Sequence, residues 1–145
     1  MKFAQIHNLR VAIKSSGHDY LGRSTAKNSL LLWTPYFQDI TFAEQFFIDG
    51  ADHGPAVTLG SGVGLKAIYA AAKARNKMFI GGTAATVSPA GGYTQGAGHS
   101  AFSPLYGLAA DNVLRRWFSP TCRTSDLRPK PQSLKSFWLM ARSLP

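Results

Sequence analysis

The sequence has few cysteines and no long apolar runs. Its one cysteine, Cys122, excludes a framework of internal disulfides and says little about the compartment. No run of about 18 apolar residues occurs, so no membrane-spanning helix is predicted. The opening MKFAQIHNLRVAIKSS lacks the apolar core and small-residue cleavage site of a signal peptide. The chain has 145 residues, of which 45% are hydrophobic, and this suffices for one domain with a hydrophobic core.

Acidic residues are also scarce, with 7 against 16 Lys and Arg, for a net charge of +9. The excess is uneven, because residues 115–145 carry seven basic side chains and a single acid, whereas residues 1–114 carry nine and six. A basic tail attracts polyanions weakly and without specificity. We therefore predict a solvated tail, and no specific nucleic-acid partner.

Glycine is absent from the same tail. All 14 glycines precede Arg115, whereas half of the 8 prolines follow it. Residues 115–145 show no sustained period of 2 or 3.6, and Pro129 and Pro131 interrupt any longer helix. These changes divide the chain into a domain over residues 1–114 and a basic tail over residues 115–145, which we expect to be disordered.

Residues 1–114 have the pattern of a mixed α+β fold in which strands outnumber helices. The helix is expected over LKAIYAAAKARN, with Leu65, Ile68, Tyr69 and Ala72 on one face and Asn76 at its end. Leu9, Val11 and Ile13 should form the buried face of the first strand, and NSLLLWT should be buried on both faces. Strands are expected over residues 9–16, 28–34, 55–62 and 78–82.

Two glycine-rich segments are candidates for ligand binding. GSGVG, residues 60–64, has the spacing G-x-G-x-G with no acid about 20 residues later, which favours a plain turn over a phosphate site. In residues 81–100, six of twenty positions are glycine, and glycines let backbone amides approach a ligand or form an anion-binding nest. A flexible linker is the alternative, but the apolar LYGLAADNVL that follows favours a ligand cradle.

The four histidines divide into two pairs. His7 and His53 are expected at the surface, whereas His18 and His99 each follow a glycine, as SGH and AGH. No third ligand stands at a recognisable spacing, so no metal site is predicted. A loop histidine is usually solvated, but one among ligand-approaching glycines can act as a nucleophile toward a bound cofactor.

The segments SSGHDYLGRS, NSLLLWT and TVSPAGGYTQGAGHSAFSPLYGLAADNVL together resemble a known family. From about residue 2 to residue 114 the chain is similar to the FAD-binding domain of the p-cresol methylhydroxylase (PCMH)/vanillyl-alcohol oxidase superfamily. Within that superfamily it most resembles the berberine-bridge-enzyme-like fungal oxidases. The resemblance implies an incomplete PCMH-type α+β domain, FAD as cofactor, and an oxidase that takes a hydride equivalent from an organic substrate.

The resemblance also implies roles for particular residues. In the family the histidine of the SGH turn, here His18, commonly bonds to the flavin 8α-methyl group, and its neighbours hold the pyrophosphate. No catalytic base is implied within this chain, so none is named. The implied cofactor-binding residues are Ser15, Ser16, Gly17, His18, Asp19, Thr86, Gly91, Gly92, Gly96 and His99.

The sequence departs from the family in several places. Some relatives carry a second covalent link through a cysteine, but here residues 83–86 read TAAT, so any link is through His18 alone. Ser88 and Ala97 stand where glycines are common. The family's preceding strand–helix–strand unit and following substrate domain have no counterpart, so we expect a fragment that is inactive by itself. The alternative is a non-enzymatic remnant that binds FAD weakly or not at all. Substrate and compartment are not indicated, although relatives are often secreted.

Overall fold

The computed structural model describes residues 2–118 and 137–142, with side chains described as far as Arg115. Within this part of the chain eight strands outnumber three α-helices, which confirms the mixed composition expected from the sequence. The strands are β1 (Arg10–Lys14), β2 (Ser29–Trp33), β3 (Ile40–Ala43), β4 (Phe47–Ile48), β5 (Ala51–Asp52), β6 (Ala56–Gly60), β7 (Val113–Phe118) and β8 (Phe137–Arg142). The helices are α1 (Lys2–Ile6), α2 (Leu65–Lys73) and α3 (Ser103–Tyr106), with short helical turns η1 (Arg23–Thr25), η2 (Pro89–Tyr93) and η3 (Ala109–Asn112).

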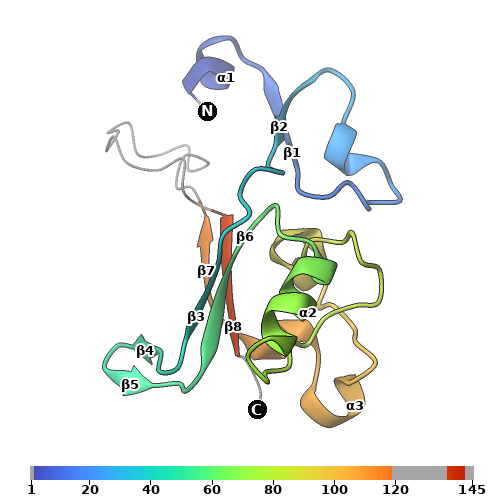
Figure 1. The fold of residues 1–145 in the computed structure, drawn as a ribbon. Helices are drawn as coiled ribbons and strands as arrows, with labels where there is room; N and C mark the ends of the chain where they lie inside the picture. Colours follow the sequence, from blue (N-terminus) through green and yellow to red (C-terminus); the bar gives the residue numbers. More distant parts are fainter. Residues whose placement is uncertain (1, 119–136, 143–145) are drawn as a thin grey trace.

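The main sheet has four antiparallel strands in the order β3-β6-β8-β7, and α2 lies beside it (Figure 1). Strand β6 is interior to the sheet, and both Val57 and Leu59 on it are fully buried. Burial of such a side chain contributes about 1.5–3 kcal/mol. The core cluster therefore forms where β6 meets the apolar face of α2. It consists of Val57, Leu59, Val63, Leu65, Ile68, Ala72 and Phe79.

Helix α2 matches the periodicity of its sequence. Leu65 and Ile68 are fully buried, and Tyr69 packs against the core from its edge. A turn follows the helix, and in it Asn76 has a left-handed φ of 50°, a conformation that Asn tolerates better than most residues. The amide of Lys77 then donates to the carbonyl of Ala72 at 3.0 Å. The predicted helix is confirmed, but it ends at Lys73, three residues before the predicted Asn76.

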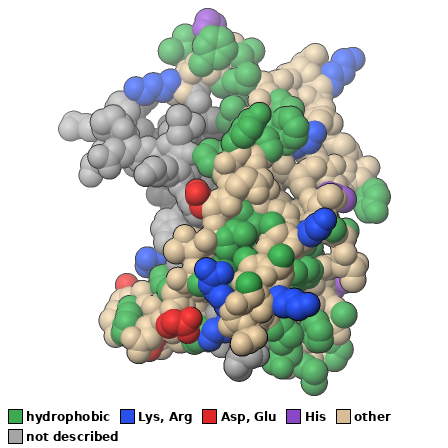
Figure 2. All heavy atoms as spheres, viewed as in Figure 1, with side chains coloured by type: hydrophobic (Ala, Val, Ile, Leu, Met, Phe, Trp, Pro, Cys, Tyr) green, Lys and Arg blue, Asp and Glu red, His purple; other side chains and the backbone are tan. Residues whose placement is uncertain are grey.

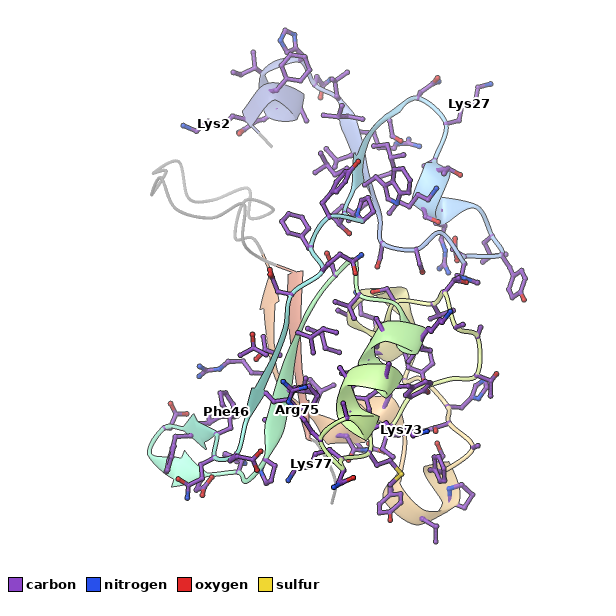
Figure 3. The ribbon with its side chains drawn as sticks, in the orientation of Figure 1. Lys2, Lys27, Phe46, Lys73, Arg75 and Lys77 are labelled. Atoms are coloured by element: carbon purple, nitrogen blue, oxygen red, sulfur yellow. The ribbon has the colours of Figure 1, made fainter. Side chains whose placement is uncertain are left out.

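The far end of α2 is tied to the β3 side of the sheet by two charged contacts. The guanidinium of Arg75 stacks over the ring of Phe42, 4.5 Å from its centroid, and Lys77 pairs with Glu44 at 3.3 Å. Figure 3 labels Lys73, Arg75 and Lys77 around this end of the helix. On the face shown in Figure 2 the basic side chains are spread over several elements and do not form one patch.

Strands β1 and β2 form a separate, parallel two-stranded sheet that carries the SGH turn at the end of β1 (Figure 1). The amide of Thr34 donates to the carbonyl of Lys14 at 3.0 Å, which holds the two strand ends together. The predicted faces of both strands are wrong. Ala12 is the buried residue of β1 while Ile13 is 42% exposed, and Trp33 of β2 is 58% exposed. Because Ala12 is apolar too, β1 has apolar side chains on both faces, and alternation does not choose between them.

Two further expectations require correction. Residues 78–82 do not form a strand, since only Met78 makes an isolated bridge. The expectation of disorder after residue 114 is wrong for the segments in β7 and β8, and β8 pairs with β6 on one side and β7 on the other. The sequence of β8 has no strand periodicity, so its backbone pairing with β6 and β7 could not be predicted from the sequence. The rest of the tail, residues 119–136 and 143–145, lies outside the described residues.

Among the residues described, no helix is long and apolar enough to cross a membrane.

Candidate cofactor-binding site

A cavity of about 1110 Å³ lies between the SGH turn and the glycine-rich segment of residues 81–100. Its volume slightly exceeds the range of about 300–1,000 Å³ that is usual for ligand pockets. The loop between β6 and α2 contributes Ser61, and α2 contributes Leu65. Of the predicted site residues, the cavity is lined by Ser15, Ser16, Gly17, His18, Asp19, Gly91, Gly92, Gly96 and His99. The structure thus brings together two motifs that lie more than 60 residues apart.

The SGH turn requires glycine at its centre. Gly17 has φ +89°, and a Cβ there would lie 2.7 Å from Cε of Lys14. The Lys14 stem fills the space beneath the turn, while its ammonium lies 4.8 Å from the centroid of the Trp33 ring. A larger residue at position 17 would therefore adopt a strained backbone and displace the flexible end of the Lys14 side chain.

Four serines fasten the turn to the other walls of the cavity. Ser15 Oγ donates to the carbonyl of Ser61 at 2.5 Å, and Ser88 Oγ donates to the same carbonyl at 2.7 Å. The amide of Ser88 donates to Ser16 Oγ at 3.2 Å. The small side chains predicted to face a phosphate therefore also join three segments that are distant in sequence.

The GSGVG loop is explained by packing. A Cβ on Gly60 would collide with the carbonyl of Phe37, and one on Gly62 with those of Thr34 and Pro35. These glycines let the loop cross another stretch of backbone closely. Ser61 lies between them and is 2% exposed.

His18 is held by the glycine-rich segment, because its Nε2 lies 2.8 Å from Oγ1 of Thr86. Of the predicted site residues, Thr86 alone does not line the cavity, but it contacts His18, which does. Among the described residues, Nδ1 of His18 has no hydrogen-bond partner. The histidine side chain is exposed at the cavity wall.

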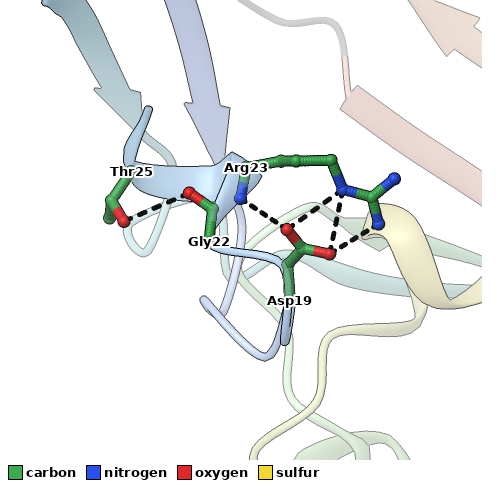
Figure 4. A network of polar contacts seen from close by, with 4 residues as sticks. All are labelled: Asp19, Gly22, Arg23 and Thr25. Carbon is green, nitrogen blue, oxygen red and sulfur yellow. Dashed lines mark hydrogen bonds and ion pairs between the residues drawn. The ribbon is translucent and has the colours of Figure 1, made fainter. Parts of the chain in front are cut away.

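Asp19 is engaged by Arg23 (Figure 4). Its carboxylate accepts the Arg23 amide at 2.6 Å and a guanidinium nitrogen at 2.6 Å. The side-chain hydrogen bond to Arg23, followed by the bond from its backbone amide, lowers the pKa of Asp19 below its usual 3.8. Since a carboxylate repels phosphate, this side chain shapes the turn, and any contact from it to a pyrophosphate is disfavoured.

His99 lies where the glycine-rich segment turns toward α3. Its carbonyl accepts the hydroxyl of Tyr93 at 2.7 Å, and burial raises the pKa of Tyr93 to about 12. Gly98, with φ +70°, packs its Cα against the Tyr93 ring, where a Cβ would lie 2.7 Å from a ring carbon. Tyr93 thereby stiffens this part of the segment, as a ligand cradle requires and a flexible linker does not.

No group of three His, Cys, Asp or Glu side chains that could hold a metal ion occurs among the described residues.

The cavity offers unpaired donors to a ligand. Ser61 Oγ is buried and has no partner among the described residues, and none is found there for the backbone amides of Gly17 and His18. A buried hydroxyl without a partner is costly unless a ligand or water satisfies it. Pyrophosphate oxygens accept hydrogen bonds from hydroxyls and amides. Open space beyond Gly92 leaves the backbone accessible. The residues present therefore fit FAD.

Ser61 was missed by the sequence analysis. The signal available was a hydroxyl residue between two glycines at a strand-to-helix junction, and it was interpreted only as a turn. Nothing in the sequence shows that this hydroxyl is buried against the SGH turn.

Comparison with known proteins identifies the fold. Residues 1–116 match the family model described as an FAD binding domain. The chain belongs to this FAD-binding domain family. It is 46% identical over 114 residues to the FAD-linked oxidoreductase patO of Aspergillus clavatus, an alignment that covers 79% of this chain and 20% of that protein. The chain spans about a fifth of the length of the curated relatives it matches.

Crystal structures agree with this assignment. The VAO-type flavoprotein MtVAO615 from Myceliophthora thermophila C1 superposes with a TM-score of 0.83 at 38% identity, over 99% of this chain and 29% of that one. The H174A variant of berberine bridge enzyme, in complex with (S)-reticuline, superposes with a TM-score of 0.60 at 26% identity, over 73% of this chain and 20% of that one. The PCMH-type fold and the resemblance inferred from the two motifs are confirmed, and the family is one of FAD-linked oxidoreductases.

Proposed function

We propose that this chain holds FAD in the cavity between the SGH turn and residues 81–100, with the flavin attached through His18, as part of an oxidase of organic substrates. The observation that carries the proposal is the convergence of both motifs on one cavity that Ser61 also lines. Among the described residues, the buried Ser61 Oγ and the amides of Gly17 and His18 have no partner. The family assignment supports FAD as the ligand.

Different residues of the cavity would have different roles in binding FAD. The amides of Gly17 and His18 and the hydroxyl of Ser61 would bind the pyrophosphate, and Gly91 and Gly92 would let the backbone approach. When bound, FAD supplies two-electron chemistry, accepting a hydride equivalent from a substrate. Ser15 Oγ and Ser88 Oγ are committed to the Ser61 carbonyl, so their role is to fix the walls.

His18 is the nucleophile of this proposal. It is exposed at the cavity wall, and among the described residues only its Nε2 has a partner. A neutral imidazole protonated on Nε2 has a lone pair on Nδ1 for bond formation. The loop that faces it, residues 83–86, contains no thiol, so a second covalent link is not expected. We extend the proposal to a small organic substrate, with no specific nucleic-acid partner and no membrane partner.

The test is reconstitution of the 145-residue chain with FAD. We expect flavin to remain with the protein after removal of free FAD, and part of it to stay after acid precipitation. His18→Ala should abolish the acid-stable fraction, whereas His53→Ala, in a loop remote from the cavity, should leave it unchanged. Acid-stable flavin on the His18→Ala protein would refute the attachment site. A chain that retains no flavin at all would favour the non-enzymatic remnant.

A further inference from the structure

The contact between His18 and Thr86 links the two motifs through side chains that both lie at the surface. Nε2 of the imidazole and Oγ1 of Thr86 are 2.8 Å apart, and no other described residue bonds to the ring. A neutral imidazole carries one proton, so Nδ1 has a free lone pair when Nε2 carries that proton and donates it to the Thr86 hydroxyl. Thr86 thus occupies Nε2 and leaves Nδ1 as the accessible ring nitrogen of His18.

We propose that Thr86 is a positioning residue for covalent attachment of FAD: its hydroxyl holds Nε2 of His18 and leaves Nδ1 as the nitrogen that bonds. This inference rests on the proposed function. An attacking carbon at Nε2 would have to displace the Thr86 hydroxyl, which already occupies that direction at hydrogen-bond distance. Nδ1 has no such obstruction among the described residues.

The hydroxyl also suits the proton balance of the step. A bond forms between Nδ1 and the flavin 8α carbon, that carbon loses one hydrogen, and the imidazole loses the proton on Nε2. The two protons and two electrons reduce the ring system, and dioxygen then takes them to give hydrogen peroxide. After the bond forms, Nε2 is an acceptor only. Thr86, which accepts from Nε2–H before the step, can donate to Nε2 after it, because a hydroxyl is both donor and acceptor.

The experiment compares the rate of covalent attachment with the affinity of reversible binding. Full-length chains carrying Thr86→Val, Thr86→Ser or Thr41→Val are mixed with FAD in air and quenched with acid over time. Valine keeps the shape of threonine without its hydroxyl, and Thr41 is an exposed threonine on β3, far along the chain from the site. At FAD concentrations that saturate reversible binding of each variant, we expect Thr86→Val to attach flavin roughly tenfold more slowly than the unmodified chain. Thr86→Ser should restore the rate, and Thr41→Val should not change it.

A second measurement needs no flavin. Nitrogen-15 NMR of the histidine rings in the FAD-free chain reports the tautomer of His18 directly. We expect Nε2 to carry the proton, and Thr86→Val to mix the two tautomers. NMR of the flavin–histidine adduct released by proteolysis should place the link at Nδ1.

The outcomes separate the inference from the function beneath it. Attachment by Thr86→Val at the original rate, a proton on Nδ1 in the free chain, or an Nε2 link overturns the role of Thr86 while His18 remains the attachment site. Loss of all acid-stable flavin from the unmodified chain overturns the proposed attachment, and the Thr86 role with it.

Discussion

At the scale of single residues, the site depends on what each small side chain leaves free. Ser15 and Ser88 use their hydroxyls on one carbonyl, and their loss would loosen the walls. Ser61 offers that carbonyl while its own hydroxyl is buried and unbonded among the described residues. A residue that is costly to the fold and placed on a cavity wall is a candidate for ligand binding.

Ser61→Ala tests this directly. Alanine removes the buried hydroxyl, so we expect weaker FAD affinity together with stability that is unchanged or higher by about 1 kcal/mol. Ser29→Ala is the matched control, because Ser29 Oγ donates to the carbonyl of Ala26 away from the cavity at 2.5 Å. That variant should lose about 1 kcal/mol of unfolding free energy and keep its FAD affinity. Fluorescence titration with FAD and thermal melts measure both quantities. An unchanged affinity in Ser61→Ala would remove Ser61 from the site.

Gly17 and Gly22 form a natural pair for a second residue-scale test. Both have positive φ, but only at Gly17 would a Cβ meet a neighbour, Cε of Lys14 at 2.7 Å. Gly22→Ala should therefore cost about 1 kcal/mol from the backbone alone. Gly17→Ala should cost more and also weaken FAD binding, because the turn must shift. Chemical denaturation of the two variants compares them. Equal costs would show that Lys14 moves aside freely.

At the scale of elements, the loop after β1 is shaped by an ion pair between Asp19, which precedes η1, and Arg23, the first residue of η1. The carboxylate accepts the first amide of η1, as an N-terminal cap does, and a guanidinium nitrogen as well. The pair is exposed on the Arg23 side, at 76%, so salt should weaken it. Its purpose is to fix the loop that continues from the SGH turn.

This pair predicts a pH dependence. The pKa of Asp19 is lowered in the folded chain, so its contribution to stability is complete above the usual value of 3.8 and is lost as the pH falls through the lower, folded-state pKa. We expect NMR signals of the loop to change in that acidic window. Asp19→Asn should remove this transition and leave the loop less ordered at neutral pH. A transition of the same midpoint in Asp19→Asn would assign it to another group.

At the scale of the whole molecule, the main sheet joins distant parts of the chain. Strand β8 stands between β6 and β7, so residues 137–142 hydrogen-bond to residues 56–60 on one side and to β7 on the other. The division of the chain at residue 115, suggested by charge and glycine content, therefore cuts through the β7 strand. A change in amino-acid composition therefore does not show where backbone pairing in a sheet ends.

Truncation after Phe118 tests the importance of β8. Its removal leaves β6 and β7 with unpaired edges, and exposed edges are sites of aggregation. We expect a lower melting temperature and greater sensitivity to protease in residues 55–60 than in the full chain. A chain ending at Leu144 is the control, because it shortens the tail and keeps β8. Identical melts for the two truncated chains would mean that residues 2–118 are sufficient for the fold.

The sequence by itself determined the mixed strand and helix composition, the presence and start of α2, and the two motifs that meet at the proposed FAD site. These are local properties: the stripe from Leu65 to Ala72 has the helical period, and glycines and serines mark where a backbone approaches a ligand. Only the tertiary structure decided which face of β1 is buried, that β8 enters the sheet, and that Ser61 Oγ has no partner among the described residues. It also decided that Asp19 binds Arg23 and that Thr86 holds His18. These depend on which segments meet in space, and neither periodicity nor composition encodes contacts between residues 46 or 68 positions apart.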